Sequence, residues 1–305
     1  MTHYQLVASN KRRSAVIMIG FVLFALIVSF VMAAALDLSL SFVGVALIIS
    51  GLMSFASYWW SDKIILTISR ARPAKREEFF DFYTTVENLV LGQRMPTPKL
   101  YVIEDTAMNA FATGRNPENA VICATTGLLS RLNRSEIEGV MAHELAHIGN
   151  YDMLLMSVVT ILVGMISLLS DWFLRMTWLG GRRKSSNNRD SGQIQMILVV
   201  VGLLLALLSP LIAQLIKLAL SRKREYLADS TAVAYSRNPA GLANALEKIS
   251  LDREPLEAAN KATAHLYIAN PLKNHKDAIG LFAKMFQTHP PIEERIKNLR
   301  ALAHT

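Results

Sequence analysis

Long apolar stretches alternate with polar, amphipathic segments along the chain. Four of them contain almost no charged residues, namely 15–36, 38–60, 153–174 and 194–220. Each is long enough for a helix that crosses the roughly 30 Å hydrocarbon core of a bilayer. The pattern therefore predicts four transmembrane helices, paired in two hairpins, with the remaining residues in water-exposed segments. For the second hairpin, the alternative is a re-entrant or partly embedded hairpin that is shielded by protein.

The polar segment between the two predicted hairpins combines strand and helix patterns. Residues 99–104 and 121–124 are typical of strands, and residues 77–91 have apolar side chains at helical spacing. Between the two strands lies a short extended segment that ends in a glycine turn, Asn109-Ala110-Phe111-Ala112-Thr113-Gly114-Arg115. At the edge of a small sheet, such a segment is either an ordinary edge strand or a strand that offers its unpaired N–H and C=O groups to an extended peptide.

Helices are predicted on both sides of the second apolar pair. One begins near Ser135, where Ser135 and Glu138 match an S-x-x-E capping box, and it leads into the third apolar stretch. Beyond the fourth stretch, helices are predicted for residues 225–234, 239–251 and 292–302. The predicted fold class is therefore a mainly α-helical membrane protein with an α+β domain that contains a small β-sheet.

Composition and charge agree with a membrane protein. Of the 305 residues, 52% are hydrophobic and 18% are charged, against roughly 25% charged residues in soluble domains. The net charge is +8, but basic residues cluster beside the apolar stretches and no nucleic-acid-binding module is recognised, so the lipid bilayer is the expected partner and nucleic acid is not. The only cysteine, Cys123, excludes internal disulfides and thiolate metal clusters. Any zinc site must therefore use histidine and carboxylate ligands.

Candidate chemistry lies in the sequence His143-Glu144-Leu145-Ala146-His147, within the helix predicted to begin near Ser135. Four residues advance about 400° around a helix, so His143 and His147 project from one face and can converge on one ion. This H-E-x-x-H spacing is typical of catalytic zinc sites. Glu144 lies beside the same face, where it can take a proton from the attacking water. The structural alternative is a pair of histidines that pack in a core or face solvent, which the strand and helix context and the capping box make the less favoured interpretation.

A catalytic zinc ion takes three protein ligands, so the third must come from elsewhere in the chain. The candidates are Asp152, Glu225, Asp229, His265, His275 and His289. Glu225 is favoured because the third and fourth apolar stretches are predicted to form an antiparallel pair, whose two flanking helices then lie on the same side. Asp229 follows Glu225 by one helical turn and can accept the free ring N–H of a zinc-binding histidine.

These residues together resemble the HtpX-type integral-membrane zinc endopeptidases, which are relatives of the CAAX prenyl proteases. The resemblance covers nearly the whole chain: the N-terminal hairpin, the segment from Asn109 to Arg115, the H-E-x-x-H motif, two apolar stretches, Glu225-Tyr226-Leu227-Ala228-Asp229 and the tail His289-Pro290-Pro291. It implies one Zn²⁺ per chain on His143, His147 and Glu225, with Glu144 as the catalytic base and Asp229 behind the ligands.

The resemblance also implies a substrate and a location. It implies that substrates are misfolded or damaged membrane proteins or unfolded polypeptides, in stress response and protein quality control, and that they pair along Asn109, Ala110, Phe111, Ala112, Thr113 and Gly114. It implies a multi-pass protein of the bacterial inner membrane with its active site facing the cytoplasm. A donor for the tetrahedral oxyanion is also needed, and His289 and Arg295 in the tail are candidates. The residues indicate no particular oligomeric state.

Five parts of the chain follow from this interpretation. They are a cytoplasmic N-terminus (1–14), a transmembrane hairpin (15–60), a cytoplasmic catalytic part with the edge strand and the H-E-x-x-H helix (61–152), a second transmembrane hairpin with a polar loop at 175–193 (153–220), and a cytoplasmic catalytic part with the third zinc ligand (221–305). Basic residues at both ends of the first hairpin support the cytoplasmic assignment.

Three alternatives use the same residues. An intramembrane-cleaving protease would place H-E-x-x-H inside a spanning helix, whereas here the motif precedes the apolar stretch. A CAAX-type protease would enclose its site in a membrane chamber, for which four apolar stretches are few. A noncatalytic zinc-containing scaffold would not need a base such as Glu144. The sequence therefore favours a membrane-anchored zinc endopeptidase.

Overall fold

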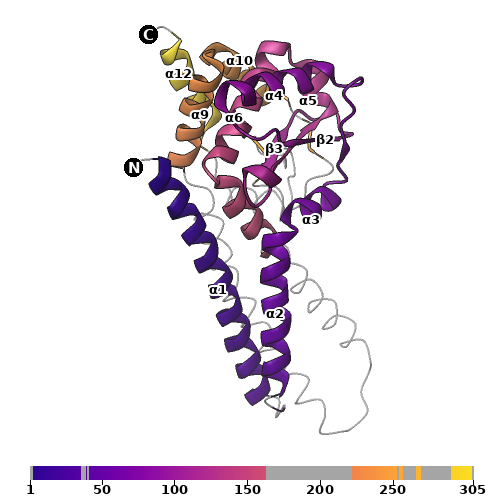
Figure 1. The fold of residues 1–305 in the computed structure, drawn as a ribbon, viewed down its shortest axis with the longest axis vertical. Helices are drawn as coiled ribbons and strands as arrows, with labels where there is room; N and C mark the ends of the chain where they lie inside the picture. Colours follow the sequence, from indigo (N-terminus) through magenta and orange to yellow (C-terminus); the bar gives the residue numbers. More distant parts are fainter. Residues whose placement is uncertain are drawn as a thin grey trace, which may run out of the picture.

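The computed structural model describes residues 3–35, 39, 41–162, 222–252, 254–256, 266–268 and 290–303. A two-helix stem, formed by α1 (His3–Ala35) and α2 (Ser41–Trp59), projects from a larger body of helices and strands (Figure 1). Most of the third predicted apolar stretch, the polar loop at 175–193 and the whole fourth stretch lie outside the described residues.

The body contains a four-stranded mixed sheet in the order β1-β2-β4-β3. The strands are β1 (Arg72–Pro73), β2 (Lys99–Ile103), β3 (Ala110–Thr113) and β4 (Val121–Thr125). β4 runs parallel to β2 and antiparallel to β3, with Phe111 opposite Cys123. The strands predicted at 99–104 and 121–124 are confirmed. The extended segment after Asn109 does form a strand, and β3 lies at the edge of the sheet.

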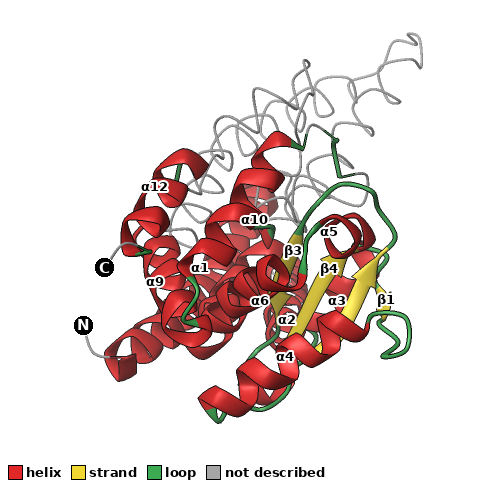
Figure 2. Cartoon of the chain, turned by 90° about the horizontal axis from the view of Figure 1, so that it is seen from above, coloured by secondary structure: helices red, strands yellow, loops and turns green. Residues whose placement is uncertain are grey.

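Helices cover the sheet and continue beyond its β3 edge. They are α3 (Ser61–Ile68), α4 (Phe80–Gln93), α5 (Thr126–Arg131), α6 (Arg134–Gly149), α9 (Arg222–Ser236), α10 (Pro239–Leu251) and α12 (Ile292–Leu302), with a 3₁₀ turn at Pro117–Asn119. Figure 2 shows α6 next to β3, with α9, α10 and α12 grouped beyond it. The helices predicted for 77–91, 225–234, 239–251 and 292–302 are confirmed to within a few residues at each end.

The start of α6 differs from the sequence-based prediction. Its N-cap is Asn133, whose side chain accepts from the Glu136 N–H while the Glu136 carboxylate accepts from the Asn133 N–H. Ser135 instead lies inside the first turn, where its hydroxyl accepts a hydrogen bond from Asn238. The prediction that Ser135 and Glu138 form the capping box is therefore wrong. The box begins two residues earlier, and the Ser135 hydroxyl instead joins α6 to the start of α10.

Small residues bring α6 close to its neighbours. Ala110 and Ala112 of β3 lie in the hydrophobic cluster that includes the buried face of α6, whereas Phe111 points into the cluster on the opposite face of the sheet. Gly139 lets α6 cross α10, since a Cβ at this position would lie 2.4 Å from the backbone nitrogen of Leu242. The sequence thus uses alanines and one glycine to hold the motif helix against both the edge strand and α10.

The stem exposes large apolar side chains along much of its length. Ile19 and Ile27 of α1 are 61% and 63% exposed, and α2 exposes Ile48 and Leu52 to the same degree. Among the described residues, no single helix has both the length and the hydropathy of a membrane span. Two sharply bent helix pairs meet both conditions together, Val43–Trp59 with Ser61–Ile68 and Arg134–Gly149 with Asp152–Leu162.

Candidate metal centre

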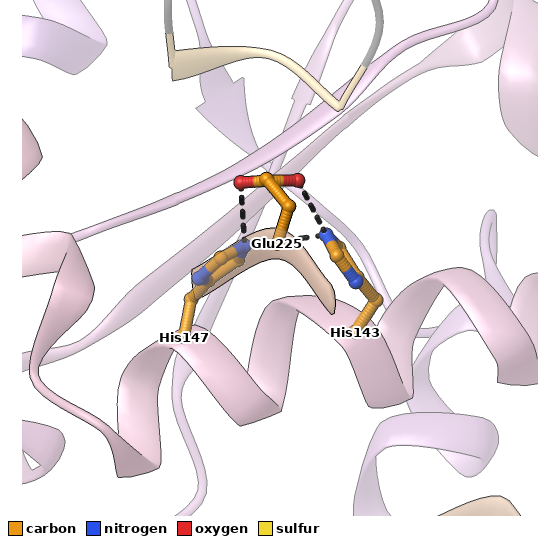
Figure 3. A group of neighbouring side chains, drawn as sticks. All are labelled: His143, His147 and Glu225. Carbon is orange, nitrogen blue, oxygen red and sulfur yellow. Dashed lines mark hydrogen bonds and ion pairs between the residues drawn. The ribbon is translucent and has the colours of Figure 1, made fainter. Parts of the chain in front are cut away.

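Three buried side chains from two helices converge in the body. His143 and His147 occupy successive turns of α6, and Glu225 reaches them from the first turn of α9 (Figure 3). The two Nε2 atoms are 3.2 Å apart. The Glu225 carboxylate spans the pair, with Oε2 3.7 Å from His143 Nε2 and Oε1 3.6 Å from His147 Nε2.

This spacing fits a metal ion. Tetrahedral zinc holds nitrogen and oxygen ligands at about 2.0–2.1 Å, which places neighbouring ligand atoms roughly 3.3 Å from one another. One ligand atom from each of His143, His147 and Glu225 lies within 4.8 Å of the others. Two neutral imidazoles and one carboxylate are also the donor set that catalytic zinc sites use, with one position left for water or substrate. The residues therefore fit zinc in both geometry and chemistry.

Carboxylates hold the outer ring nitrogens of both histidines. Asp229 Oδ1 lies 3.0 Å from His143 Nδ1, as the sequence predicts for an acidic residue one turn after Glu225. Asp152 Oδ2 lies 3.2 Å from His147 Nδ1. Such carboxylate–histidine contacts fix the tautomer that leaves Nε2 free for a metal. Both histidines are thus oriented before any ion binds.

Sequence reasoning considered Asp152 only as a possible third ligand and missed its contact with the outer nitrogen of His147. α6 ends at Gly149, Tyr151 takes a left-handed conformation (φ 59°), and the next helix, Asp152–Leu162, starts at an angle of 83° to α6. This turn directs the side chain of Asp152 back onto the ring of His147. The sequence signal for this contact is an acidic residue, Asp152, that follows a short turn directly after the H-E-x-x-H helix.

Arg295, from α12, is enclosed by the acidic side of the centre and is 1% exposed. Its Nε and Nη2 donate to both oxygens of Asp229, at 2.8 and 2.7 Å, and Nη2 lies 3.4 Å from His143 Nε2. Its remaining nitrogen, Nη1, lies 3.6 Å from Glu225 Oε2 and donates to the Ile268 carbonyl at 3.4 Å. The other predicted tail residue, His289, lies outside the described residues.

The pKa values of the two histidines move in opposite directions. For His143, burial and then the charge of Arg295 lower the pKa to about 4. For His147, burial also lowers the pKa, but the contact with Asp152 and the charge of Glu225 outweigh it and raise the pKa to about 9. Since the two Nε2 atoms lie 3.2 Å apart, the rings titrate as a coupled pair, in which a proton is favoured on His147 over His143. A metal ion must displace this proton before it can bind.

Glu144 lies beside the cluster and next to β3. Its side chain is buried, and burial raises its pKa to about 7, with the charge of His147 opposing and that of Glu225 adding to the shift. The backbone N–H of Ala112 donates a hydrogen bond to this carboxylate, which lowers the pKa. A carboxyl group with a pKa near neutral can both take up and return a proton.

The outer edge of β3 is partly occupied. On the side away from β4, the carbonyl of Ala110 accepts a hydrogen bond of 3.0 Å from the N–H of Ile268. Tyr267 packs edge-on against Phe111, with ring centroids 5.1 Å apart. Figure 3 shows a short segment with the colour of residues 266–268 above the Glu225 carboxylate. The edge that sequence reasoning assigned to substrate thus runs directly past the metal centre, and residues 266–268 contact it.

A helix with the H-E-x-x-H spacing, a glutamate from a second helix and the edge of a small sheet beside them define a metallopeptidase of the zincin type. The comparisons with known proteins agree. The model of peptidase family M48 matches residues 78–303, so the chain belongs to this family. Members of the family are zinc metallopeptidases, and the predicted enzyme class and resemblance are confirmed.

Two relatives match over almost their whole length. The chain is 41% identical to a protease HtpX homolog of Thermoanaerobacter pseudethanolicus, over 99% of this chain and 98% of that protein. It is 42% identical, with the same two coverages, to a protease HtpX homolog of Caldanaerobacter subterraneus. Among solved structures, Ste24p of S. mikatae aligns with a TM-score of 0.49 and 19% identity, over 97% of this chain and 67% of that one.

Proposed function

We propose that this metallopeptidase is a membrane-anchored zinc endopeptidase that hydrolyses misfolded or damaged membrane proteins at the cytoplasmic face of the bacterial inner membrane. His143, His147 and Glu225 would hold one zinc ion, and Glu144 would act as the base. The observation that carries the proposal is the buried cluster of these three ligands, with Glu144 adjacent to it and the edge of β3 alongside.

Each residue around the metal centre is proposed to have a separate role in peptide hydrolysis. When bound, zinc polarises the scissile carbonyl and lowers the pKa of water. Glu144 takes the proton of the attacking water and returns it to the leaving amine, for which a pKa near 7 is suitable. Asp229 and Asp152 keep the histidine rings in the metal-binding tautomer. Burial of the whole group strengthens each of these electrostatic interactions.

Arg295 is proposed to stabilise the oxyanion that develops on the scissile carbonyl. Two of its nitrogens are committed to Asp229, which fixes the guanidinium in place, and Nη1 faces the metal centre. That nitrogen already donates to a peptide carbonyl, that of Ile268. A donor held in this way needs little reorganisation when charge develops on a substrate carbonyl. The role predicted for His289 remains a prediction.

Extended substrates are proposed to add a strand to β3, along the segment that includes Asn109, Ala110, Phe111, Ala112, Thr113 and Gly114. Main-chain pairing at a sheet edge is independent of side-chain identity, which suits an enzyme that handles unfolded polypeptides. Gly114 ends the strand at φ 133°, where a side chain would collide with the carbonyl oxygen of Asn119. A substrate that pairs with Ala110 has to displace the N–H of Ile268.

Membrane anchoring is supported by the stem. Its exposed isoleucines and leucines would be costly in water and are favourable in lipid. At the junction with the body, the guanidinium of Arg115 lies over the ring of Trp59, 4.2 Å from its centroid, and tryptophan is enriched at membrane–water interfaces. Lys11, Arg12 and Arg13 are exposed in α1 at this same end of the stem, next to the body, and basic residues favour the cytoplasmic side.

One comparison of variants tests the proposal. We expect full-length protein in detergent to contain one zinc and to cleave casein, Glu225→Ala to lose both, and Glu144→Gln to keep zinc but lose cleavage. Glu138→Gln is the matched control, because Glu138 lies on the same helix outside the cluster and should change neither property. Undiminished cleavage by Glu144→Gln would refute the mechanism. Zinc-loaded wild type that cleaves no polypeptide would favour a scaffold instead.

A further inference from the structure

At the N-terminal end of α1, the buried side-chain amide of Asn10 joins this helix to the body. Its side chain is 1% exposed, although the three residues that follow it, Lys11, Arg12 and Arg13, are all exposed. Nδ2 donates to the carbonyl of Asn150 at 2.9 Å and to Asp152 Oδ1 at 2.8 Å. Oδ1 accepts from Arg224 Nη1 at 3.2 Å. All of these partners are more than 100 residues away in sequence.

The partners of Asn10 are the neighbours of the proposed metal ligands. Asp152 uses its second oxygen, Oδ2, to contact His147 Nδ1 at 3.2 Å, so one carboxylate links Asn10 to a ligand ring. Arg224 immediately precedes Glu225, the ligand from α9. Asn10 therefore contacts both ligand-bearing helices close to the metal centre: α6 through the turn that follows it, and α9 through its first turn.

We propose that Asn10 is a positioning residue of the metal centre, so that α1 is a component of the active site as well as an anchor. This inference rests on the proposed zinc site. The amide locks Asp152 in the rotamer that orients His147, and its acceptor oxygen holds Arg224 beside the carboxylate. Loss of such an outer partner of a metal-binding histidine typically lowers metal affinity or activity by about 10–100-fold.

A purely mechanical role for Asn10 predicts a different result. Lys11 makes a contact at the same junction, with its ammonium 4.3 Å from the ring of Tyr151, but no described contact joins Lys11 to Asp152. Lys11→Met is therefore a matched control that weakens the attachment of α1 without altering the carboxylate. If α1 only anchors the body, Asn10 and Lys11 variants should have similar effects on zinc binding.

The test measures zinc affinity of full-length, detergent-purified protein by competition with a chelator. We expect Asn10→Ala to bind zinc about 10–100-fold more weakly and to alter the visible absorption of the cobalt-substituted protein, while Lys11→Met leaves both unchanged. Asn10→Gln, which keeps the amide, serves as a milder variant if Asn10→Ala does not fold. Wild-type affinity in both Asn10 variants would overturn the proposal, as would equal weakening by Lys11→Met.

A double-mutant cycle tests whether Asn10 acts on the metal centre through Asp152. If Asn10 acts through Asp152, the change Asn10→Ala has little further effect on zinc affinity once Asp152→Ala has been made, so the two losses are not additive. Additive losses would refute the route through Asp152 and would leave only the contact of Asn10 with Arg224. Failure of the wild type to bind zinc refutes the proposed function as well, whereas normal zinc binding by Asn10→Ala refutes only the role of α1.

Discussion

Replacing Glu144 by glutamine should change catalysis and stability in opposite directions. Glutamine is nearly isosteric but cannot take a proton from water, so the general-base contribution of about 10²–10⁴-fold is lost. This corresponds to roughly 3–5 kcal/mol of transition-state stabilisation. Zinc content should be unchanged, because the three side chains that could hold the ion are His143, His147 and Glu225, and Glu144 is not among them.

The effect of Glu144 on stability follows from its pKa, which burial raises from 4.5 to about 7. A carboxyl group whose pKa is higher in the folded state binds its proton more tightly there than in the unfolded chain. The contribution of Glu144 to the free energy of unfolding of the metal-free protein therefore falls as the pH rises from about 4.5 to about 7, and then levels off. The full shift corresponds to about 3 kcal/mol, which Glu144→Gln would recover above pH 7.

The assay is chemical denaturation of metal-free wild type and Glu144→Gln at pH 5 and at pH 8, together with casein cleavage by the zinc-loaded forms. We expect near-equal stability at pH 5 and a more stable variant at pH 8, alongside the loss of activity. Glu138→Gln should match the wild type throughout. Equal stability of the two proteins at both pH values would show that Glu144 is not held in a desolvated site and would refute the reasoning.

Three further predictions concern other parts of the protein. Zinc binding at pH 7 should release about one proton, because His147 has a pKa of about 9 without metal; calorimetry in buffers of different ionisation enthalpy measures this, and no release would contradict it. Gly139→Ala should destabilise the fold by about 1–3 kcal/mol through its collision with α10, whereas Gly92→Ala, with no atom within 4 Å, should not; thermal unfolding compares them. Ile268→Pro removes the N–H that donates to the carbonyl of Ala110, so the KM for casein should fall several-fold relative to Ile268→Val. An unchanged KM would mean that this N–H does not obstruct substrate binding.

Features that depend on neighbours in sequence could be predicted without the structure. The spacing of His143 and His147 determines that both rings project from one helix face, because four residues make slightly more than one turn. The strands β2 and β4 and the helices α4, α9, α10 and α12 followed from periodicity. Glu225 was expected at the centre because its helix flanks the predicted antiparallel pair of apolar stretches, and Asp229 because it follows Glu225 by one helical turn; the structure brings both to the histidines.

Other features of the site depend on contacts between distant segments. Ser135, which is not the N-cap of α6, instead accepts a hydrogen bond from Asn238, about 100 residues later in the chain at the start of α10. The contact of Asp152 with His147 required the sharp turn after Gly149, and its partner Asn10 lies 142 residues earlier. Local spacing constrains side chains along one helix, but it carries no information about which helix packs beside it. The sequence alone therefore determined the chemistry of the H-E-x-x-H helix, and only tertiary packing decided which residues hold its histidines in place.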